Sequence, residues 1–153
     1  MIDELIKLVR KEFMISWDGI HGGAHMARVL ENGLRVADES GSNVEVVTLF
    51  AYLHDSKRMN NGKDPEHGAR GADFAKTLRG SLITLDDAAF DLLEYAIRHH
   101  TDGMTEADVT VQTCWDADRL DLGRIGIKPD PAYLCTPTAK RPDIIQWAYG
   151  RST

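Results

Sequence analysis

The feature that most constrains this chain is an apolar run that ends on two polar residues. The stretch "LFAYLHDSKRMNNG", residues 49–62, is rich in helix formers until it reaches His54 and Asp55, which two cations and a turn follow. An imidazole and a carboxylate are both unfavourable to bury unless something pairs with them. A metal ion is one such partner, so the run predicts a buried helix that ends at a polar site.

The composition is typical of one soluble globular domain. The 153 residues are 42% hydrophobic, and a chain of this length buries roughly two-thirds of its unfolded surface. The two cysteines, Cys114 and Cys135, show no CxxC spacing, and the segment "MIDELIKLVRKEF" is amphipathic and charged, unlike a signal peptide. No apolar run approaches the roughly 18 residues of a membrane span. We therefore expect a reduced, cytoplasmic protein with no membrane partner.

The charge balance weighs against one class of partner. The formal net charge is −6, from 24 acidic and 18 basic residues, and no basic block stands out. We therefore expect no nucleic-acid partner, because such proteins gain affinity by neutralising phosphates. A small phosphorylated substrate stays compatible, since metal ions can reverse the local sign of an acidic pocket. The sequence leaves the oligomeric state open, with a homodimer among the alternatives.

Hydrophobic periodicity predicts an all-α fold in one domain, residues 1–153. Apolar residues recur at helical spacing, and strict alternation over a strand length is scarce. Asn43 is a candidate N-cap, as is Thr84 or Asp86, and Pro65 is expected in a first helical turn. The tail holds four of the five prolines and predicts an irregular lid or flank with a short final helix. The helices are expected over residues 2–13, about 24–39, 44–55, 66–80, 84–100 and about 109–122.

The histidines lie in positions that suit metal binding. All six stand at a predicted helix edge or beside a loop, and several have carboxylates nearby: His21, His25, His54, His67, His99 and His100. Taken alone, each is more simply an exposed or core imidazole. Together, imidazole and carboxylate suit Mn, Fe, Ni, Co, Zn or Mg, and the lack of nearby cysteine argues against a structural thiolate zinc site. Ligands from several helices would leave coordination positions open, as in a catalytic site.

Three motifs between residues 20 and 125 resemble a known family. "HMARV", "AYLHDSK" and "DADRLD" are similar to the HD-domain superfamily of metal-dependent hydrolases, whose pattern is a histidine, a His-Asp pair and a distant aspartate. The resemblance implies an HD-domain helical bundle in which His25, His54, Asp55 and Asp118 bind a first metal ion. Asp118 is preferred over Asp116 because it immediately precedes "RL".

Further histidines resemble those of the two-metal members, which include cyclic-dinucleotide phosphodiesterases and CRISPR nuclease domains. By the resemblance of "PEHGARGA" and "AIRHH", His67, His99 and His100 hold a second ion, and Asp55 bridges both. Adjacent helical residues point about 100° apart, so His99 and His100 share one ion only if the helix frays at "HHTDG". One ion remains the alternative. The chain lacks the "HHE" and "GYP" elements of the cyclic-di-GMP phosphodiesterases, so that substrate is not implied.

The resemblance implies a metal-dependent phosphohydrolase that cleaves a phosphomonoester or phosphodiester of a small molecule, which we interpret as a nucleotide. Asp55 and His67 are the expected catalytic residues, with the cations of Lys57 and Arg58 holding a phosphate. His21 is a candidate for substrate contact or for support of the ligands, and Asp116 for accepting a ligand histidine's N–H.

Two other functions fit the same residues. Some HD-domain proteins of similar ligand order use a mixed-valent di-iron pair to activate oxygen and cleave carbon-carbon or carbon-phosphorus bonds. A non-catalytic nucleotide sensor is a further alternative, although sensors would be expected to lack one of the four first ligands, and all four are present here.

Overall fold

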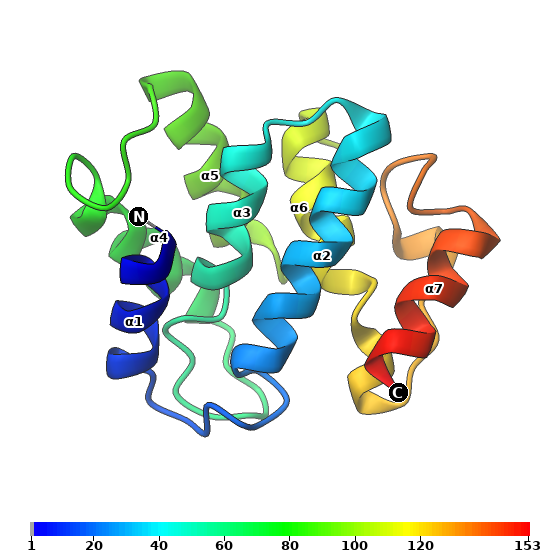
Figure 1. Ribbon diagram of the computed structural model, residues 1–153, viewed down its shortest axis with the longest axis horizontal. Coiled ribbons are helices and arrows are strands. Elements are labelled where there is room, and N and C mark those ends of the chain that lie inside the picture. The colour runs from blue at the N-terminus through cyan, green and yellow to red at the C-terminus, as the bar shows by residue number, and fades with distance from the viewer. Residues whose placement is uncertain (1) are drawn as a thin grey trace.

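The computed structural model describes residues 2–153 and is helical throughout (Figure 1). The only pairing of strand type within these residues is an isolated bridge between Arg79 and Ile83, so the all-α prediction is confirmed. None of the helices in this part of the chain is both long and apolar enough to span a membrane. The elements are α1 (Ile2–Glu12), α2 (Gly23–Ser40), α3 (Val44–Leu53), α4 (His67–Leu78), α5 (Asp87–His99), α6 (Val109–Arg119), the 3₁₀ turns η1 (Leu122–Ile125) and η2 (Pro131–Tyr133), and α7 (Pro142–Ser152).

The helix boundaries follow local sequence chemistry. Asn43 and Asp86 are N-caps whose side chains accept the N–H groups of Val46 and Ala89, as predicted for both positions. Gly41 ends α2 with a φ of +75°, a conformation that glycine adopts without steric cost. Pro65 differs from its prediction: it lies before α4 and not in its first turn, because a turn at residues 64–67 precedes the helix.

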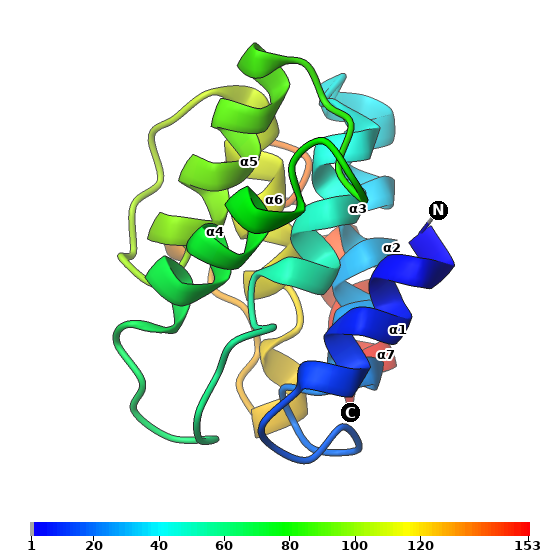
Figure 2. The same cartoon turned by 90° about the vertical axis from the view of Figure 1, so that its left-hand side faces the viewer.

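Helix α3 is the centre of the fold. Val46, Val47, Phe50, Ala51 and Leu53 have no exposed surface, because α2, α5 and α6 pack along this helix while α1 and α4 cover the rest (Figures 1 and 2). Beyond its exposed first turn the helix is apolar on most of its faces, and such a helix is stable only in a buried position. Its C-terminal end, where the His-Asp pair stands, is consequently placed inside the molecule.

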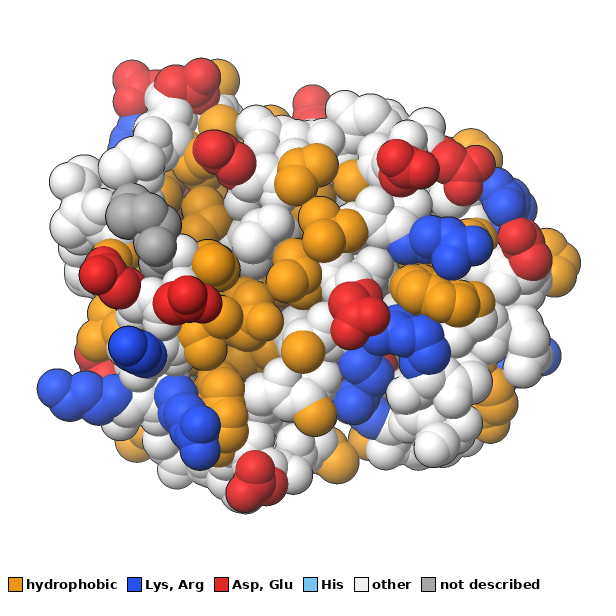
Figure 3. Space-filling model, in the orientation of Figure 1, with side chains coloured by type: hydrophobic (Ala, Val, Ile, Leu, Met, Phe, Trp, Pro, Cys, Tyr) orange, Lys and Arg blue, Asp and Glu red, His pale blue; other side chains and the backbone are white. Residues whose placement is uncertain are grey.

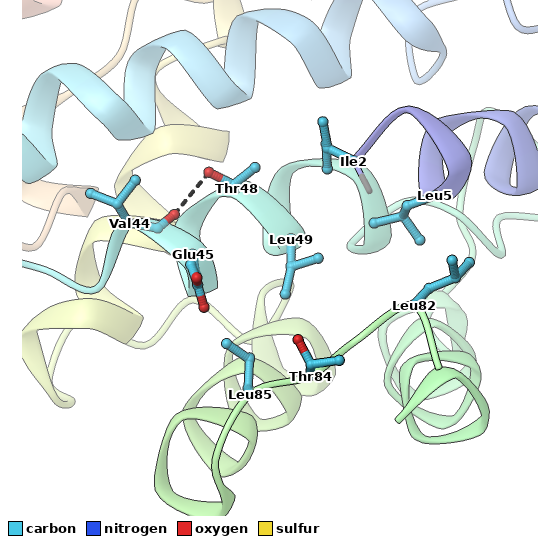
Figure 4. A pocket seen from close by; sticks show the side chains of 9 residues that line it. All are labelled: Ile2, Leu5, Val44, Glu45, Thr48, Leu49, Leu82, Thr84 and Leu85. Carbon is cyan, nitrogen blue, oxygen red and sulfur yellow. Dashed lines mark hydrogen bonds between the residues drawn. The ribbon is translucent and has the colours of Figure 1, made fainter. Parts of the chain in front are cut away.

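A separate apolar pocket lies between α1, α3 and the segment before α5. It has a volume of about 280 Å³, and Figure 4 shows its side chains pointing into it. Figure 3 shows a band of hydrophobic side chains on this side of the molecule. The lining consists of apolar residues with one acid and two threonines: Ile2, Leu5, Val44, Leu49, Leu82, Leu85, Glu45, Thr48 and Thr84. It contains none of the histidines, so it is distinct from the site described below.

The C-terminal flank is fixed to α6 by one buried carboxylate. Asp116 accepts hydrogen bonds from the backbone N–H groups of Cys135 (2.6 Å) and Thr136 (2.9 Å) and from the Thr136 hydroxyl (2.7 Å). A second apolar cluster then seals the flank and α7 against α2 and α6, and it contains Val36, Leu120, Leu134, Ala139, Ile144, Ile145 and Ala148. Asp116 therefore anchors the flank, and the prediction that it supports a ligand histidine is wrong.

Replacing Asp116 by alanine should destabilise the protein strongly. Two buried donors of Thr136 and the partly buried N–H of Cys135 would lose their acceptor, and each unsatisfied buried group costs about 1–3 kcal/mol. We expect the free energy of unfolding, measured by urea denaturation, to fall by about 3 kcal/mol or more. Asp130→Ala is the matched control, because the exposed Asp130 only caps η2 through Ala132 N–H, a bond worth about 1 kcal/mol. Equal losses in the two variants would show that Asp116 is not an anchor.

Candidate metal centre

The carboxylate of Asp55 lies at the centre of a buried cluster of imidazoles. Helix α3 ends at Leu53, His54 caps it, and Asp55 follows directly. Asp55 Oδ2 faces three ring nitrogens, those of His21 (Nδ1, 3.3 Å), His25 (Nε2, 3.2 Å) and His54 (Nε2, 3.3 Å). Asp55 Oδ1 faces His67 Nε2 (3.1 Å) and His100 Nε2 (3.5 Å). Each carboxylate oxygen therefore faces its own group of histidines.

Four of these histidines are held in the same tautomer. Each places its Nδ1 against an oxygen, which can only accept, so the ring proton is on Nδ1 and the Nε2 lone pair points toward the cluster. The acceptors are Asp121 Oδ2 for His25 (2.6 Å), the carbonyls of Ala51 (3.0 Å) and Phe50 (3.1 Å) for His54, the Asp64 carbonyl for His67 (2.5 Å), and the Ile97 carbonyl for His100 (2.6 Å). This is the orientation that metal-binding histidines adopt.

The inward-facing nitrogens meet in two pairs. His25 Nε2 lies 3.1 Å from His54 Nε2, and His67 Nε2 lies 2.9 Å from His100 Nε2. Two lone pairs cannot satisfy one another, so each pair needs a cation beside it, either a proton or a metal ion. With Asp55, the pairs form two sets whose ligand atoms lie within 4.8 Å of one another. The donor set therefore fits divalent ions that prefer nitrogen and oxygen ligands.

Asp118 completes the first set. Its Oδ1 lies 3.3 Å from both His25 Nε2 and His54 Nε2. It is also the most accessible of the six groups, with 17% of its side chain exposed against 4% for Asp55. Solvent therefore reaches the cluster from the side of Asp118.

The electrostatics show that the cluster favours positive charge. Burial would lower the pKa of His25 and His54, but their carboxylate partners outweigh it and raise these pKa values to about 9 and about 10. Burial would likewise raise the pKa of Asp55 and Asp118, but the adjacent charge on His54 holds both well below the usual range. Without metal ions His25 and His54 therefore retain protons, which a bound cation would displace.

A carboxylate that the sequence did not identify supports His25. Asp121 has almost no exposed surface, and besides His25 it accepts a hydrogen bond from Arg28 Nε at 2.7 Å. A carboxylate behind a ligand imidazole fixes the ring and raises its basicity. The spacing in "DADRLD" could have predicted this role, because Asp121 follows Asp118 by three residues, about one helical turn, at the end of α6.

The support of His67 comes from the loop that precedes α4. Asp64, whose carbonyl orients His67, is held by Arg70 NH2 at 2.7 Å from both carboxylate oxygens. The Asp64 side chain also accepts the Met59 N–H, and Arg70 Nε donates to the Lys57 carbonyl. Loop 57–64 is therefore tied to the first turn of α4 beside the second set of ligands.

The structure places two predicted site residues outside the cluster. His99 is one-third exposed, and its Nδ1 pairs with Asp102 at 2.7 Å because α5 continues through it and turns it away from His100. Lys57 also points away: its Nζ lies 2.7 Å from Glu12 and 4.1 Å above the Phe74 ring. The predictions of His99 as a ligand and Lys57 as a phosphate contact are therefore corrected.

Arg58 lies at the edge of the cluster. Its Nε is 3.4 Å from Asp55 Oδ1 and is buried without a hydrogen-bond partner among residues 2–153. Its NH1 donates to the carbonyls of Asn60 and Gly62. His21, 7% exposed, stands at the same edge, with Nε2 near the Asn61 carbonyl at 3.4 Å.

Comparison with known proteins agrees with this arrangement. The family model of the HD domain matches residues 22–123, which contain all the cluster residues except His21. The fold is similar to the crystal structure of a predicted HD superfamily hydrolase from an uncultured Thermotogales bacterium, with a TM-score of 0.75 and 28% identity, over 97% of this chain and 85% of that one. No curated protein matches the sequence. The chain thus belongs to the HD-domain family.

Proposed function

We propose that this protein is a two-metal phosphohydrolase that cleaves a phosphomonoester or phosphodiester of a small molecule, a nucleotide. The observation that carries the proposal is the double set of ligands around Asp55, with one carboxylate oxygen for each pair of imidazoles. Bound there, two divalent ions would supply water that ionises near neutral pH and would neutralise charge on a phosphoryl group. The hydrolase description of the structurally similar protein supports the same reaction class.

The chain's own residues have distinct tasks in this proposal. His25, His54 and Asp118 would hold the first ion and His67 and His100 the second, with one carboxylate oxygen of Asp55 facing each set. Because every ligand imidazole is fixed through its Nδ1, the site is preorganised and needs little rearrangement on loading. His21 lies beside Asp55 and is placed to carry a proton for the leaving oxygen.

Arg58 is the residue proposed to bind the substrate phosphate. It lies on the same loop as Asp55, and its buried Nε has no hydrogen-bond partner among residues 2–153. A guanidinium matches the geometry of phosphate oxygens and stays charged at all relevant pH values. The carbonyls of Asn60 and Gly62 already hold its NH1, so the donors that remain have a fixed direction.

Replacing Asp55 by alanine should remove both metal ions and turnover together. The test measures product release from phosphomonoesters, phosphodiesters and nucleotides with added Mn²⁺, Ni²⁺, Co²⁺ or Mg²⁺, and metal content by mass spectrometry. We expect turnover to fall by at least about 1000-fold, the order lost when a principal charge-stabilising group is removed. Full metal content and rate in the variant would overturn the site.

The same experiment separates the alternatives. The oxygenase would be favoured if no substrate of the panel gave product and the purified protein held two irons with a mixed-valent electron paramagnetic resonance signal. Nucleotide binding without product over hours would favour the sensor. Either result would refute the hydrolase.

Single histidine variants should show which residues bind the second ion, through the number of ions that each variant binds. His67→Ala and His100→Ala each remove one ligand of the second set, so each is expected to bind one ion where the wild type binds two. His99→Ala is the matched control, because His99 is adjacent to His100 but pairs only with Asp102. It should keep both ions and the full rate. Loss of an ion in His99→Ala would restore His99 as a ligand.

Arg58→Ala should weaken substrate binding without changing metal content. A hydrogen bond to a charged group contributes about 1.5–3 kcal/mol, which corresponds to roughly 10–100-fold in KM. Lys57→Ala is the control, since Lys57 pairs with Glu12 and points away from the cluster. An unchanged KM for Arg58→Ala in steady-state kinetics would show that the phosphate is held elsewhere.

A further inference from the structure

Helix α4 approaches its neighbours unusually closely at two glycines. A Cβ atom on Gly68 would lie 2.8 Å from the Arg98 carbonyl oxygen and 2.9 Å from that of Ile97, both at the end of α5. A Cβ on Gly71 would lie 2.9 Å from the carbonyl oxygen of Leu53, at the end of α3, and 3.1 Å from Ile97 Cγ2. The contacts shorter than 3.0 Å are all with backbone carbonyl oxygens, so no flexible side chain can move aside to admit even a methyl group.

The carbonyls beneath these glycines belong to the metal centre. The Ile97 oxygen that Gly68 contacts is the acceptor that orients His100 through Nδ1 at 2.6 Å. The Leu53 oxygen that Gly71 contacts accepts the Ser56 hydroxyl at 2.7 Å, and this bond shapes the turn that carries Asp55. The two glycines therefore touch the backbone on both sides of the second set of ligands.

We propose that Gly68 and Gly71 are positioning residues for the second metal ion, an inference that rests on the proposed two-metal function. The second set takes one ligand from each of three elements: Asp55 after α3, His67 at the start of α4 and His100 at the end of α5. Its size is set by how closely α4 approaches the other two helices. Side chains at positions 68 and 71 would push α4 outward and carry His67 away from His100.

The use of glycine at these positions has a measurable cost, which supports a specific role. Glycine inside a helix is less stable than alanine by roughly 0.5–1 kcal/mol. Gly150 in α7 shows the contrast, because a Cβ there would meet nothing within 4 Å. Gly150→Ala is therefore a matched control: the same substitution in a helix, without the steric contact.

The test measures Mn²⁺ binding to the whole protein by isothermal titration calorimetry and metal content by mass spectrometry. We expect two ions for the wild type and for Gly150→Ala. For Gly68→Ala and Gly71→Ala we expect the first ion at unchanged affinity and the second weakened at least about tenfold, the order lost when support of a ligand is disturbed. Exchange coupling in the electron paramagnetic resonance spectrum of the Mn²⁺ pair should be replaced by an isolated-ion signal.

Several outcomes would overturn the inference. Two ions at wild-type affinity in both variants would show that α4 adjusts without effect on the site. Loss of both ions, or of the folded state in both variants by circular dichroism, would show that the glycines serve the core and not the second ion. If only Gly71→Ala fails to fold, the affinity of Gly68→Ala for the second ion decides whether the inference holds.

The proposed function fails on different evidence. Wild-type protein that binds two ions but releases no product from any ester would refute the hydrolase and leave the role of the glycines intact. Wild-type protein that turns over substrate with a single ion would refute the role of the glycines and the second ion, and would leave only the hydrolysis of a phosphate ester standing.

Discussion

The buried carboxylate of Asp55 is the constraint on which the rest of the structure depends. Only 4% of its side chain is exposed, and taking a carboxylate out of water costs several kcal/mol unless its surroundings replace the lost hydration. Five imidazoles supply that replacement, and they come from segments before α2, within α2, after α3, at the start of α4 and at the end of α5. These segments must therefore meet at one point.

The helix arrangement favours positive charge at that point. His54 caps the C-terminal end of α3 and His100 that of α5, where the unsatisfied carbonyls carry partial negative charge. The carboxylates of Asp55, Asp118 and Asp121 add to it. In the absence of metal ions this negative charge is balanced by protons on His25 and His54, whose pKa values are raised. Divalent ions would balance it while leaving the imidazoles neutral.

The sequence was informative wherever periodicity or local spacing carried the structure. Helical stripes and caps predicted the all-α fold, and the position of His54 and Asp55 at the end of an apolar run predicted their burial. The choice between His99 and His100 could not be made this way, because both stand in one helical turn and only the rotation of α5 separates them. Asp116 and Asp121 were also indistinguishable, since the end of α6 decides which of them faces His25.

The two faces of α6 show why the proline-rich flank packs against the helices and does not cover the cluster. Residues two apart on a helix point about 200° apart, so Asp116 and Asp118 lie on opposite sides of α6. Asp118 faces the imidazoles, whereas Asp116 holds Cys135 and Thr136. The flank is consequently fixed on the far side of α6 from the cluster. The residues that do stand at the edge of the cluster are Arg58 and His21, each of which faces an oxygen of Asp55.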